Sequence, residues 1–496
     1  MSGVLSVVRD LARSEQGATA LLTAMVATTV VGAMLTAFDI ARLHLTQTRL
    51  QLSVDAAALA ATRDATSPTL DGDVRAVFDA NFRPGFLGTV VADFAVLPLV
   101  QDDATVSMQI KAEVDLPSVL SPMLSIVASD LFYLEASATT LRRTLGVELA
   151  LVLDNTGSMR GGNKIGALRD AAQLLTDIVF DGRESVPNLQ VAVVPYTATV
   201  NIGDQHAFWL ADPATAPLIP PASMADFAPT DWKGCVLART GGEDSTETPP
   251  GVAPLDPFFY PASDPAVCTP FPKKQRRLNC WPDGAGQVDE RNGAQNDGYG
   301  PNLGCGPPIL PLTESYDAVT ATIAGMQPWH RGGTMANMGL VWGWRALSPD
   351  WRGLWRRPNG TAITDRPFDY DHPSTRKVVV LMTDGNNEWY QDDYTAYRFP
   401  ADDVLGIGGG KRTVEINARM LAACTALKTN GVVVFTVTFG SAPSGATQKL
   451  YRDCASAPDQ DPAFPGLKYF HAPTAAALSA SFSDIAGQLT ELRLIQ

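Results

Sequence analysis

The chain has 496 residues, which is long for a single hydrophobic core and indicates two or three domains. Charged residues make up only 18% of it, the formal net charge is −14, and the basic residues are not gathered into one run. Because a nucleic-acid partner needs a clustered basic face, this charge distribution argues against one, and the acidic balance is mainly a solubility feature.

The first element in chain order is an uncharged apolar stretch, residues 17–38 (GATALLTAMVATTVVGAMLTAF). A helix of this length spans roughly 33 Å, enough to cross the apolar core of a bilayer. A cleaved signal peptide usually has a shorter apolar region, and a prepilin leader usually places a glutamate where this chain has Leu22. We therefore expect an uncleaved single-pass membrane anchor rather than either of these or a buried core helix.

The helical pattern continues beyond the span through Leu43, Leu50, Val54, Ala57 and Ala61. The sequence thus predicts one long helix from Gly17 to Arg63, and an anchor domain over residues 1–63. Its stripe of small residues suits packing on a partner or on the chain's own globular part; plain surface amphipathicity is the alternative.

Residues 64–145 predict a small α/β unit with no catalytic constellation. An aspartate begins a predicted helix over 71–82, and three stretches alternate as half-buried strands do, 89–99, 104–116 and 132–143.

From residue 146 to 496, strands alternate with helices, the signature of a doubly wound, mainly parallel α/β sheet. The predicted strands are 147–153, 189–196, 377–384, 431–439 and 467–472, and the predicted helices are 164–180, 313–326, 334–347, 414–429 and 474–493. A long Cys/Pro/Gly-rich insertion, 204–312, interrupts this rhythm, and a shorter Trp/Arg/Pro-rich one follows at 349–375.

The cysteines indicate which side of the membrane this part occupies. Arg9 and Arg13 before the span balance Arg42 and Arg49 after it, so the arginines do not orient it. All six cysteines follow residue 234 and none forms a Cys-x-x-Cys pair. Their even number suggests disulfides outside the cytoplasm, with reduced buried thiols as the alternative. We expect one bond between Cys424 and Cys454; the pairing of the others stays open, namely Cys235, Cys268, Cys280 and Cys305.

Oxygen-bearing side chains follow two of the predicted strands. Asp154, Thr156 and Ser158 lie in LVLDNTGSM, Asp384 ends the strand VVVLMTDG, and Thr334 follows two glycines in GGTMANMGL. In an open parallel sheet, ligands bind beyond the carboxyl ends of the strands, so both aspartates should reach one edge. Two carboxylates and three hydroxyls form a hard-oxygen set suited to Mg²⁺ or another divalent cation.

A protease loop and simple helix capping both fit these residues less well. An aspartic protease needs a contiguous Asp-Thr-Gly in two copies, whereas Asn155 separates Asp154 from Thr156 and no second copy exists. Either aspartate alone could simply cap a following helix or turn, but capping would not account for all five residues together.

These three stretches resemble the metal-ion-dependent adhesion site of von Willebrand factor A domains, over about 145–200 and 313–495. Thr156 replaces the serine that this family usually has and keeps the hydroxyl. The resemblance implies a metal held by Asp154, Thr156, Ser158, Thr334 and Asp384.

The N-terminal stretch LARSEQGATALLTAMV, with FDIARLHLTQTRLQLSVDAAALAAT, resembles the anchor of TadG-like proteins of Flp (tight adherence) pilus assembly. The stretches GLVWGWRALSP, LAACTALKTNGVVVFTVTFG and LYRDCAS are similar to the same family. This resemblance implies a role in pilus assembly or adhesion, and a bacterial inner-membrane anchor with the C-terminal part in the periplasm. Residues 204–312 carry no recognisable motif.

We therefore expect a membrane-anchored binding protein whose metal captures an acidic residue of a pilus or envelope protein, without a small-molecule substrate. The alternative is a structural scaffold in which the metal is a local brace. An enzyme would need a positioned general base, and we expect none. The five histidines stand in no recognisable arrangement, and only His330 is close in sequence to a site residue: His44, His206, His330, His372 and His471.

Overall fold

The computed structural model describes residues 15–63, 69–101, 105–119, 131–143, 146–186, 188–212, 232–263, 279, 300–329, 332–357, 359–408, 411–441, 443–461 and 465–492. The expectations for Arg9, Arg13, Cys268, Cys280 and His330 concern positions outside the described residues. The chain divides into two compact units, one up to Arg143 and one from Thr144 to Ile495.

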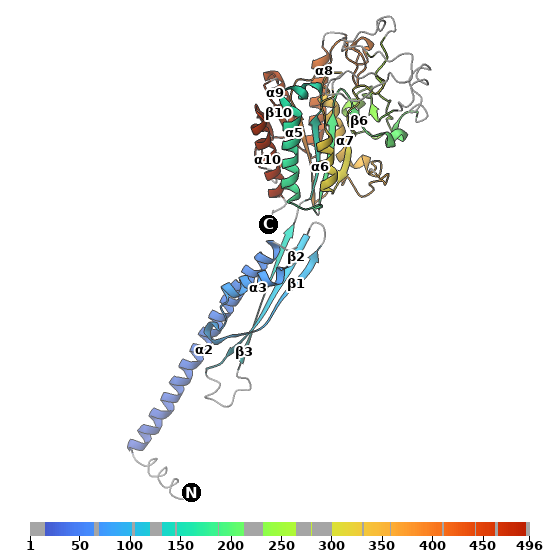
Figure 1. Ribbon diagram of the computed structural model, residues 1–496. Helices are drawn as coiled ribbons and strands as arrows, with labels where there is room; N and C mark the ends of the chain where they lie inside the picture. The colour runs from blue at the N-terminus through green and yellow to red at the C-terminus, as the bar shows by residue number, and fades with distance from the viewer. Residues whose placement is uncertain are drawn as a thin grey trace. The chain divides into compact units, whose positions relative to one another are not determined.

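The first unit begins with α2 (Glu15–Arg63), a helix of 49 residues (Figure 1). Its apolar first part exposes large side chains such as Leu22 and Met34. The hydroxyls of Thr23, Thr29 and Thr36 donate to carbonyl oxygens one turn earlier, so these three have partners even in an apolar surrounding. By length and composition α2 is able to cross a membrane, as the sequence predicted.

The second part of α2 packs on a three-stranded antiparallel sheet of order β1-β2-β3, with α3 (Leu70–Asn81) beside it. The strands are β1 (Val90–Gln101), β2 (Thr105–Pro117) and β3 (Leu131–Arg143). Leu50, Val54, Ala57 and Ala61 of the helix are fully buried in this core. The stripe of small residues therefore packs on the chain's own sheet, and the helix and strands predicted for the small unit are confirmed.

Charged residues attach α2 to this sheet directly after the apolar stretch. Asp39 is buried and accepts hydrogen bonds from the Ser118 hydroxyl at 2.8 Å and the Val119 backbone N–H at 3.1 Å. Arg42 donates to the carbonyl oxygens of Leu87 at 2.6 Å and Pro117 at 3.0 Å. The helix is therefore fixed to the folded unit at the point where its apolar face ends.

The second unit contains an eight-stranded sheet of order β11-β10-β9-β4-β5-β6-β7, with β8 pairing with β5. The parallel strands are β4 (Gly146–Asp154), β5 (Leu189–Tyr196), β9 (Thr375–Thr383), β10 (Val433–Phe439) and β11 (Tyr469–Ala472). The antiparallel ones are β6 (Val200–Asn201), β7 (Cys235–Val236) and β8 (Leu310–Thr313). The predicted parallel α/β fold is confirmed, with all five predicted strands.

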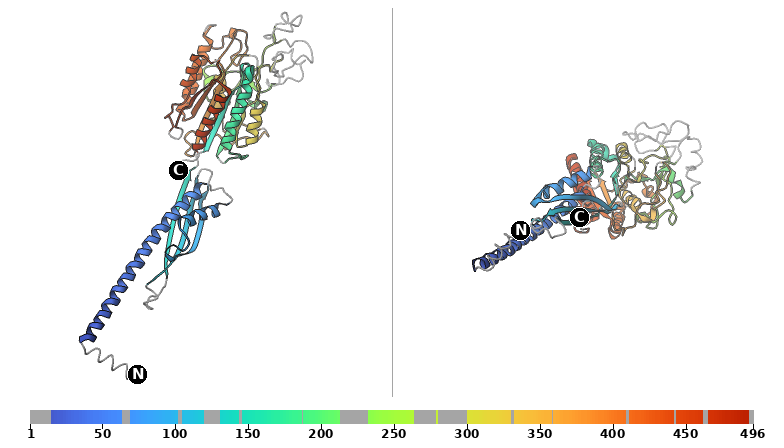
Figure 2. Two further views of the ribbon diagram at one scale, coloured as in Figure 1. Left: turned by 60° about the vertical axis from the view of Figure 1, so that its left-hand side comes forward. Right: turned by 90° about the horizontal axis from the view of Figure 1, so that it is seen from below.

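Helices cover both faces of this sheet, which is why its central strands are apolar throughout. One face packs against α5 (Lys164–Phe180), α6 (Tyr316–Gly325) and α10 (Ala475–Leu492), and Figures 1 and 2 show α5 and α10 side by side. The other packs against α7 (Ala336–Leu347), α8 (Arg412–Thr429) and α9 (Gly445–Cys454). Alternate residues of each strand serve the two cores: Val152 faces α7, and Leu151 faces α5.

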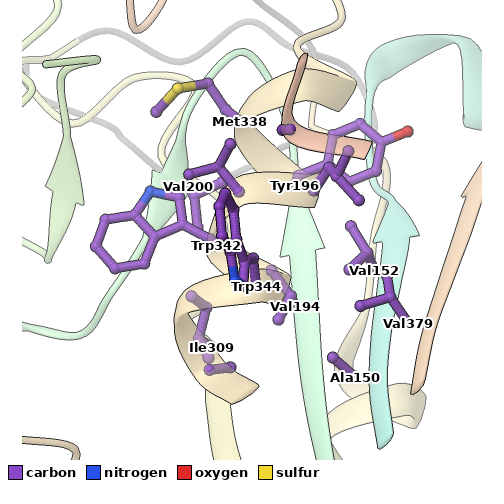
Figure 3. Close-up of a cluster of buried hydrophobic side chains, with 14 of the residues drawn as sticks. Ala150, Val152, Val194, Tyr196, Val200, Ile309, Met338, Trp342, Trp344 and Val379 are labelled. Carbon is purple, nitrogen blue, oxygen red and sulfur yellow. The ribbon is translucent and has the colours of Figure 1, made fainter. Parts of the chain in front are cut away.

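Two glycines allow α7 to lie directly on the sheet. A Cβ on Gly339 would stand 2.6 Å from the Tyr196 ring, and one on Gly343 would stand 2.5 Å from Val152. The close approach places Trp342 in a core with Val152 and Val194, as Figure 3 shows.

The described parts of the insertion belong to this core rather than standing apart from it. β7 and β8 extend the sheet from within or next to 204–312, and Trp209 is buried in the core on the α7 face. A disulfide joins Cys235 to Cys305, and the predicted bond between Cys424 and Cys454 is confirmed. The sequence showed a break in periodicity here; the structure shows irregular chain that is nevertheless packed.

Candidate metal centre

The candidate site lies at the carboxyl edge of the sheet, where β4 and β9 end side by side. These strands are parallel neighbours, with Leu153 opposite Met382. Asp154 is the last residue of β4, and Asp384 directly follows β9. The expectation that both aspartates reach one edge is therefore confirmed.

Two hydroxyl groups connect the two carboxylates. Thr156 donates from its backbone N–H (2.8 Å) and its hydroxyl (2.6 Å) to Oδ1 of Asp154. Ser158 donates to Oδ1 of Asp384 at 2.6 Å, and the two hydroxyl oxygens are 3.0 Å apart. Four of the five predicted ligands are thus linked through a continuous series of oxygen contacts.

This series has more oxygen lone pairs than protons. Each hydroxyl has one proton. When both hydroxyls donate to the carboxylates, no proton is left between Thr156 Oγ1 and Ser158 Oγ, so these two oxygens face each other with lone pairs only. A hard cation placed beside such oxygens satisfies the lone pairs that hydrogen bonding leaves over. Thr156 is buried whereas Ser158 is exposed, so the cluster opens to solvent on the Ser158 side.

The inner oxygen of Asp154 is fixed from below. Its Oδ2 accepts hydrogen bonds from the Thr383 hydroxyl at 2.9 Å and the Tyr196 hydroxyl at 3.2 Å. Asp154 is fully buried, and that burial, together with the neighbouring Asp384 carboxylate, raises the pKa of Asp154 above its usual range. Two buried carboxylates this close favour either a proton or a cation between them.

A protein cation already lies at the site. Nζ of Lys164, the first residue of α5, is 2.6 Å from Oδ2 of Asp384. The Asp384 side chain is fully buried and that of Lys164 is 24% exposed, so this ion pair sits at the boundary between core and solvent. Lys164 therefore supplies part of the positive charge that the two aspartates need.

Thr334, the fifth predicted ligand, pairs with the loop that follows Asp384. Its backbone N–H and C=O pair with Glu388, at 2.9 and 3.0 Å, in the loop that follows Asp384. A Cβ on Gly333 would be only 1.6 Å from the Glu388 carbonyl oxygen, so glycine is what allows the two loops to touch. Among the described residues, the Thr334 hydroxyl makes no hydrogen bond with the other four ligands.

Sequence reasoning missed Lys164, Thr383 and Tyr196. Tyr196 could have been found, because it ends β5 directly opposite Asp154 and so follows the same edge rule as the two aspartates. Thr383 adjoins a predicted ligand. Nothing in the sequence distinguishes Lys164 from an ordinary solvated lysine at the start of a helix.

The donor set fits a hard divalent cation in its chemistry. Carboxylate and hydroxyl oxygens are what Mg²⁺ and Ca²⁺ prefer. Within the described part of the chain, no group of three or more His, Cys, Asp and Glu side chains is placed to hold a metal. Any metal at this edge would therefore be held by two carboxylates and by neutral hydroxyls, without histidine or cysteine and without a third carboxylate from the described residues.

No protein-family model and no curated protein matches the chain. Among solved structures it is similar to proximal thread matrix protein 1 from the mussel byssus with a zinc-occupied MIDAS motif, at 13% identity and TM-score 0.31, over 70% of this chain and 46% of that one. It is also similar to the pilus adhesin SpaC from Lactobacillus rhamnosus GG, at 11% identity and TM-score 0.33, over 81% of this chain and 34% of that one. A third similar structure is the vWF domain of the type V pili tip protein Mfa5 from Porphyromonas gingivalis, at 10% identity and TM-score 0.34, over 71% of this chain and 97% of that one.

The chain spans about half the length of the mussel protein and about a third of SpaC. With identities of 10–13% and TM-scores of 0.31–0.34, these similarities carry no functional argument. The fold therefore rests on the chain's own strand order: a mainly parallel α/β sheet with helices on both faces, whose carboxyl edge carries the aspartate–hydroxyl cluster.

Proposed function

We propose that this chain is a membrane-anchored protein that binds an acidic residue of a partner protein through a divalent cation, preferably Mg²⁺. The observation that carries the proposal is the series Asp154–Thr156–Ser158–Asp384, with contacts of 2.6, 3.0 and 2.6 Å at the carboxyl edge of the sheet.

In this proposal Asp154, Thr156, Ser158 and Asp384 hold the cation, and Thr334 is available from the adjoining loop. The hydroxyls of Thr156 and Ser158 add no negative charge to that of the two carboxylates, and a cation with an open coordination position acts as a Lewis acid toward a carboxylate oxygen of the partner. Tyr196 and Thr383 orient Asp154 by donating to its inner oxygen. Burial of both aspartates keeps water from competing for them.

We further propose the setting of Flp (tight adherence) pilus assembly, with α2 in the bacterial inner membrane and the second unit in the periplasm. The sequence resemblance of the anchor to TadG-like proteins supports this setting. The two disulfides also support it, because such bonds persist in oxidising compartments. The partner would then be a pilus or envelope protein.

Metal titration of the full-length protein in detergent tests the proposal. We expect calorimetry to show one Mg²⁺ or Mn²⁺ bound to the wild type and none to Asp154→Asn. The control is Asp181→Asn, which changes an exposed carboxylate just after α5. Capture of envelope proteins should be lost both in chelator and in Asp154→Asn. Equal metal binding by Asp154→Asn and the wild type would refute the assignment.

A structural scaffold is the second candidate, and Lys164 favours it. Because its ammonium already pairs with Asp384, the edge has a counter-ion without any metal. In that case the variants that disturb pilus assembly would lie at Asp39 and Arg42, where α2 joins the small unit, while Asp154→Asn would assemble normally.

We propose a binding role without catalysis. A general base would most often be a histidine, and three of the described histidines make contacts other than with the candidate ligands. His206 stacks on Trp209, His372 stacks on Phe368, and His471 contacts the Thr438 hydroxyl. Metal-dependent hydrolysis of a phosphoester or peptide by the purified protein would overturn this.

A further inference from the structure

A groove of about 480 Å³ opens at the same edge of the sheet, beginning two residues after Asp384. Its walls are the loop 386–391 after β9, the first turn of α8 with residues 411–414, and the first turn of α9 with residues 444–447. The loop 386–391 comes directly after β9, and residues 444–447 come after β10, so the groove lies at the carboxyl ends of parallel strands, where open α/β sheets bind ligands.

Hydrogen bonds between its walls hold the groove in shape. Asn386 accepts from the hydroxyls of Ser444 and Thr447 at the start of α9. Asn387 donates to Asn417 of α8 at 2.8 Å and accepts from the backbone N–H of Ala336 at 3.1 Å. A surface held in this way loses little conformational entropy when a partner binds.

The groove has an excess of positive charge. Lys411 and Arg412 have no carboxylate partner among the described residues, and the first turn of α8 has no side-chain cap. Glu388 also lines the groove and offsets one of these two positive charges, and the nearby Glu415 pairs with Arg419 at 3.1 Å. The helix dipole adds to the two cations, because an amino-terminal turn carries about half a positive charge.

The rim also offers apolar contact. Tyr390 is 51% exposed and Val414 is 67% exposed, and both line the groove. Exposed tyrosine beside arginine is typical of a surface that binds protein, since tyrosine and arginine are enriched where partners dock.

We propose that this groove docks an acidic segment of the partner protein, with Lys411 and Arg412 pairing with a second acidic side chain. The inference rests on the proposed function, in which the first acidic residue goes to the metal. It adds that a single carboxylate is not the whole recognition element: the partner presents two, in one extended segment with an apolar residue for Tyr390 and Val414. Paired charges of this kind raise the association rate and fix the orientation of the segment.

Fluorescent peptides test this with the full-length protein in detergent. The probes are Glu-(Gly)n-Glu peptides with n from 1 to 6, and the same peptides with the second Glu replaced by Gln. In Mg²⁺ we expect at least one two-Glu peptide to bind tenfold more tightly than its Gln counterpart. Lys411→Gln with Arg412→Gln should abolish that tenfold gain and leave the binding of the Gln peptides unchanged. Arg452→Gln, which removes an exposed cation at the far end of α9, is the control.

The outcomes separate the two claims. Metal-dependent binding without any gain from the second Glu in the whole series overturns the groove and leaves the metal site standing. A gain that needs Lys411 and Arg412 but not Mg²⁺ supports the groove and overturns metal-dependent capture. Binding that depends on neither the metal nor these cations overturns both.

Discussion

Replacing Lys164 by methionine should strengthen divalent-cation binding by about 30-fold. The Lys164 ammonium lies 2.6 Å from Oδ2 of Asp384, so a cation held by the same carboxylate must share it or displace the lysine. A charge pair about 4 Å apart interacts by ~1 kcal/mol in water and by ~4 kcal/mol at an effective dielectric constant of ~20. Because Asp384 is fully buried and Lys164 is only partly exposed, we take ~2 kcal/mol for the interaction of this ion pair. Since ~1.4 kcal/mol changes an affinity tenfold, removing the competing ammonium should strengthen cation binding by about 30-fold.

The assay is calorimetric titration of the full-length protein with Mg²⁺ and Mn²⁺. Methionine keeps the apolar stem of the lysine, so the substitution removes the charge with little loss of packing. The matched control is Arg183→Met, which removes an exposed cation just beyond the opposite end of α5 and should change affinity less than twofold.

Thermal unfolding gives a second readout. Without metal, Lys164→Met should melt at a lower temperature than the wild type, because the buried Asp384 loses its counter-ion, and saturating Mg²⁺ should reverse the difference. Unchanged or weaker metal affinity in this variant would refute the view that Lys164 competes with a cation for Asp384.

Three further predictions concern the packing of the second unit. Gly333→Ala should cost ~1–3 kcal/mol of unfolding free energy, because its Cβ would meet the Glu388 carbonyl oxygen, whereas Gly325→Ala has open space and should be neutral in the same urea titration. Burial lowers the pKa of His206 to about 4, so as the pH falls the unfolded chain takes up this proton before the folded chain does. The free energy of unfolding should therefore fall by ~2–3 kcal/mol from pH 7 to pH 4 through this group. A His206→Gln variant that lost as much stability as the wild type over this range would contradict this. Removing the Cys424–Cys454 bond, which closes 30 residues, should lower stability by ~3–4 kcal/mol, and an unchanged melting temperature would exclude that.

The parallel sheet could be predicted because its signal is local and repeated. Each of the five parallel strands is an apolar or β-branched run, and helices recur between them along the unit. The edge rule then brought Asp154 and Asp384 together across 230 residues of sequence. The bond between Cys424 and Cys454 was also predicted, and in the structure its cysteines lie on α8 and α9, the helices before and after β10.

The missed features depend on tertiary contacts that have no sequence period. Lys164 looks like any lysine at a helix start, and only the packing of α5 brings it to Asp384. The insertion has no alternation of apolar and polar residues, yet Trp209 is buried in the core, because it lies between β6 and β7, which pair with each other in the sheet. Thr334 was predicted as a ligand, but its pairing with Glu388 was not, because that contact between two loops requires Gly333 and has no sequence pattern of its own.

The attachment of α2 through Asp39 and Arg42 has a mechanical consequence. No swivel separates the apolar part of the helix from the small sheet, because one continuous rod belongs to both and is bonded to the sheet where lipid would end. If α2 is the proposed membrane anchor, tension or torque applied to that sheet would be transmitted along the helix axis into the bilayer instead of being absorbed by a flexible tether.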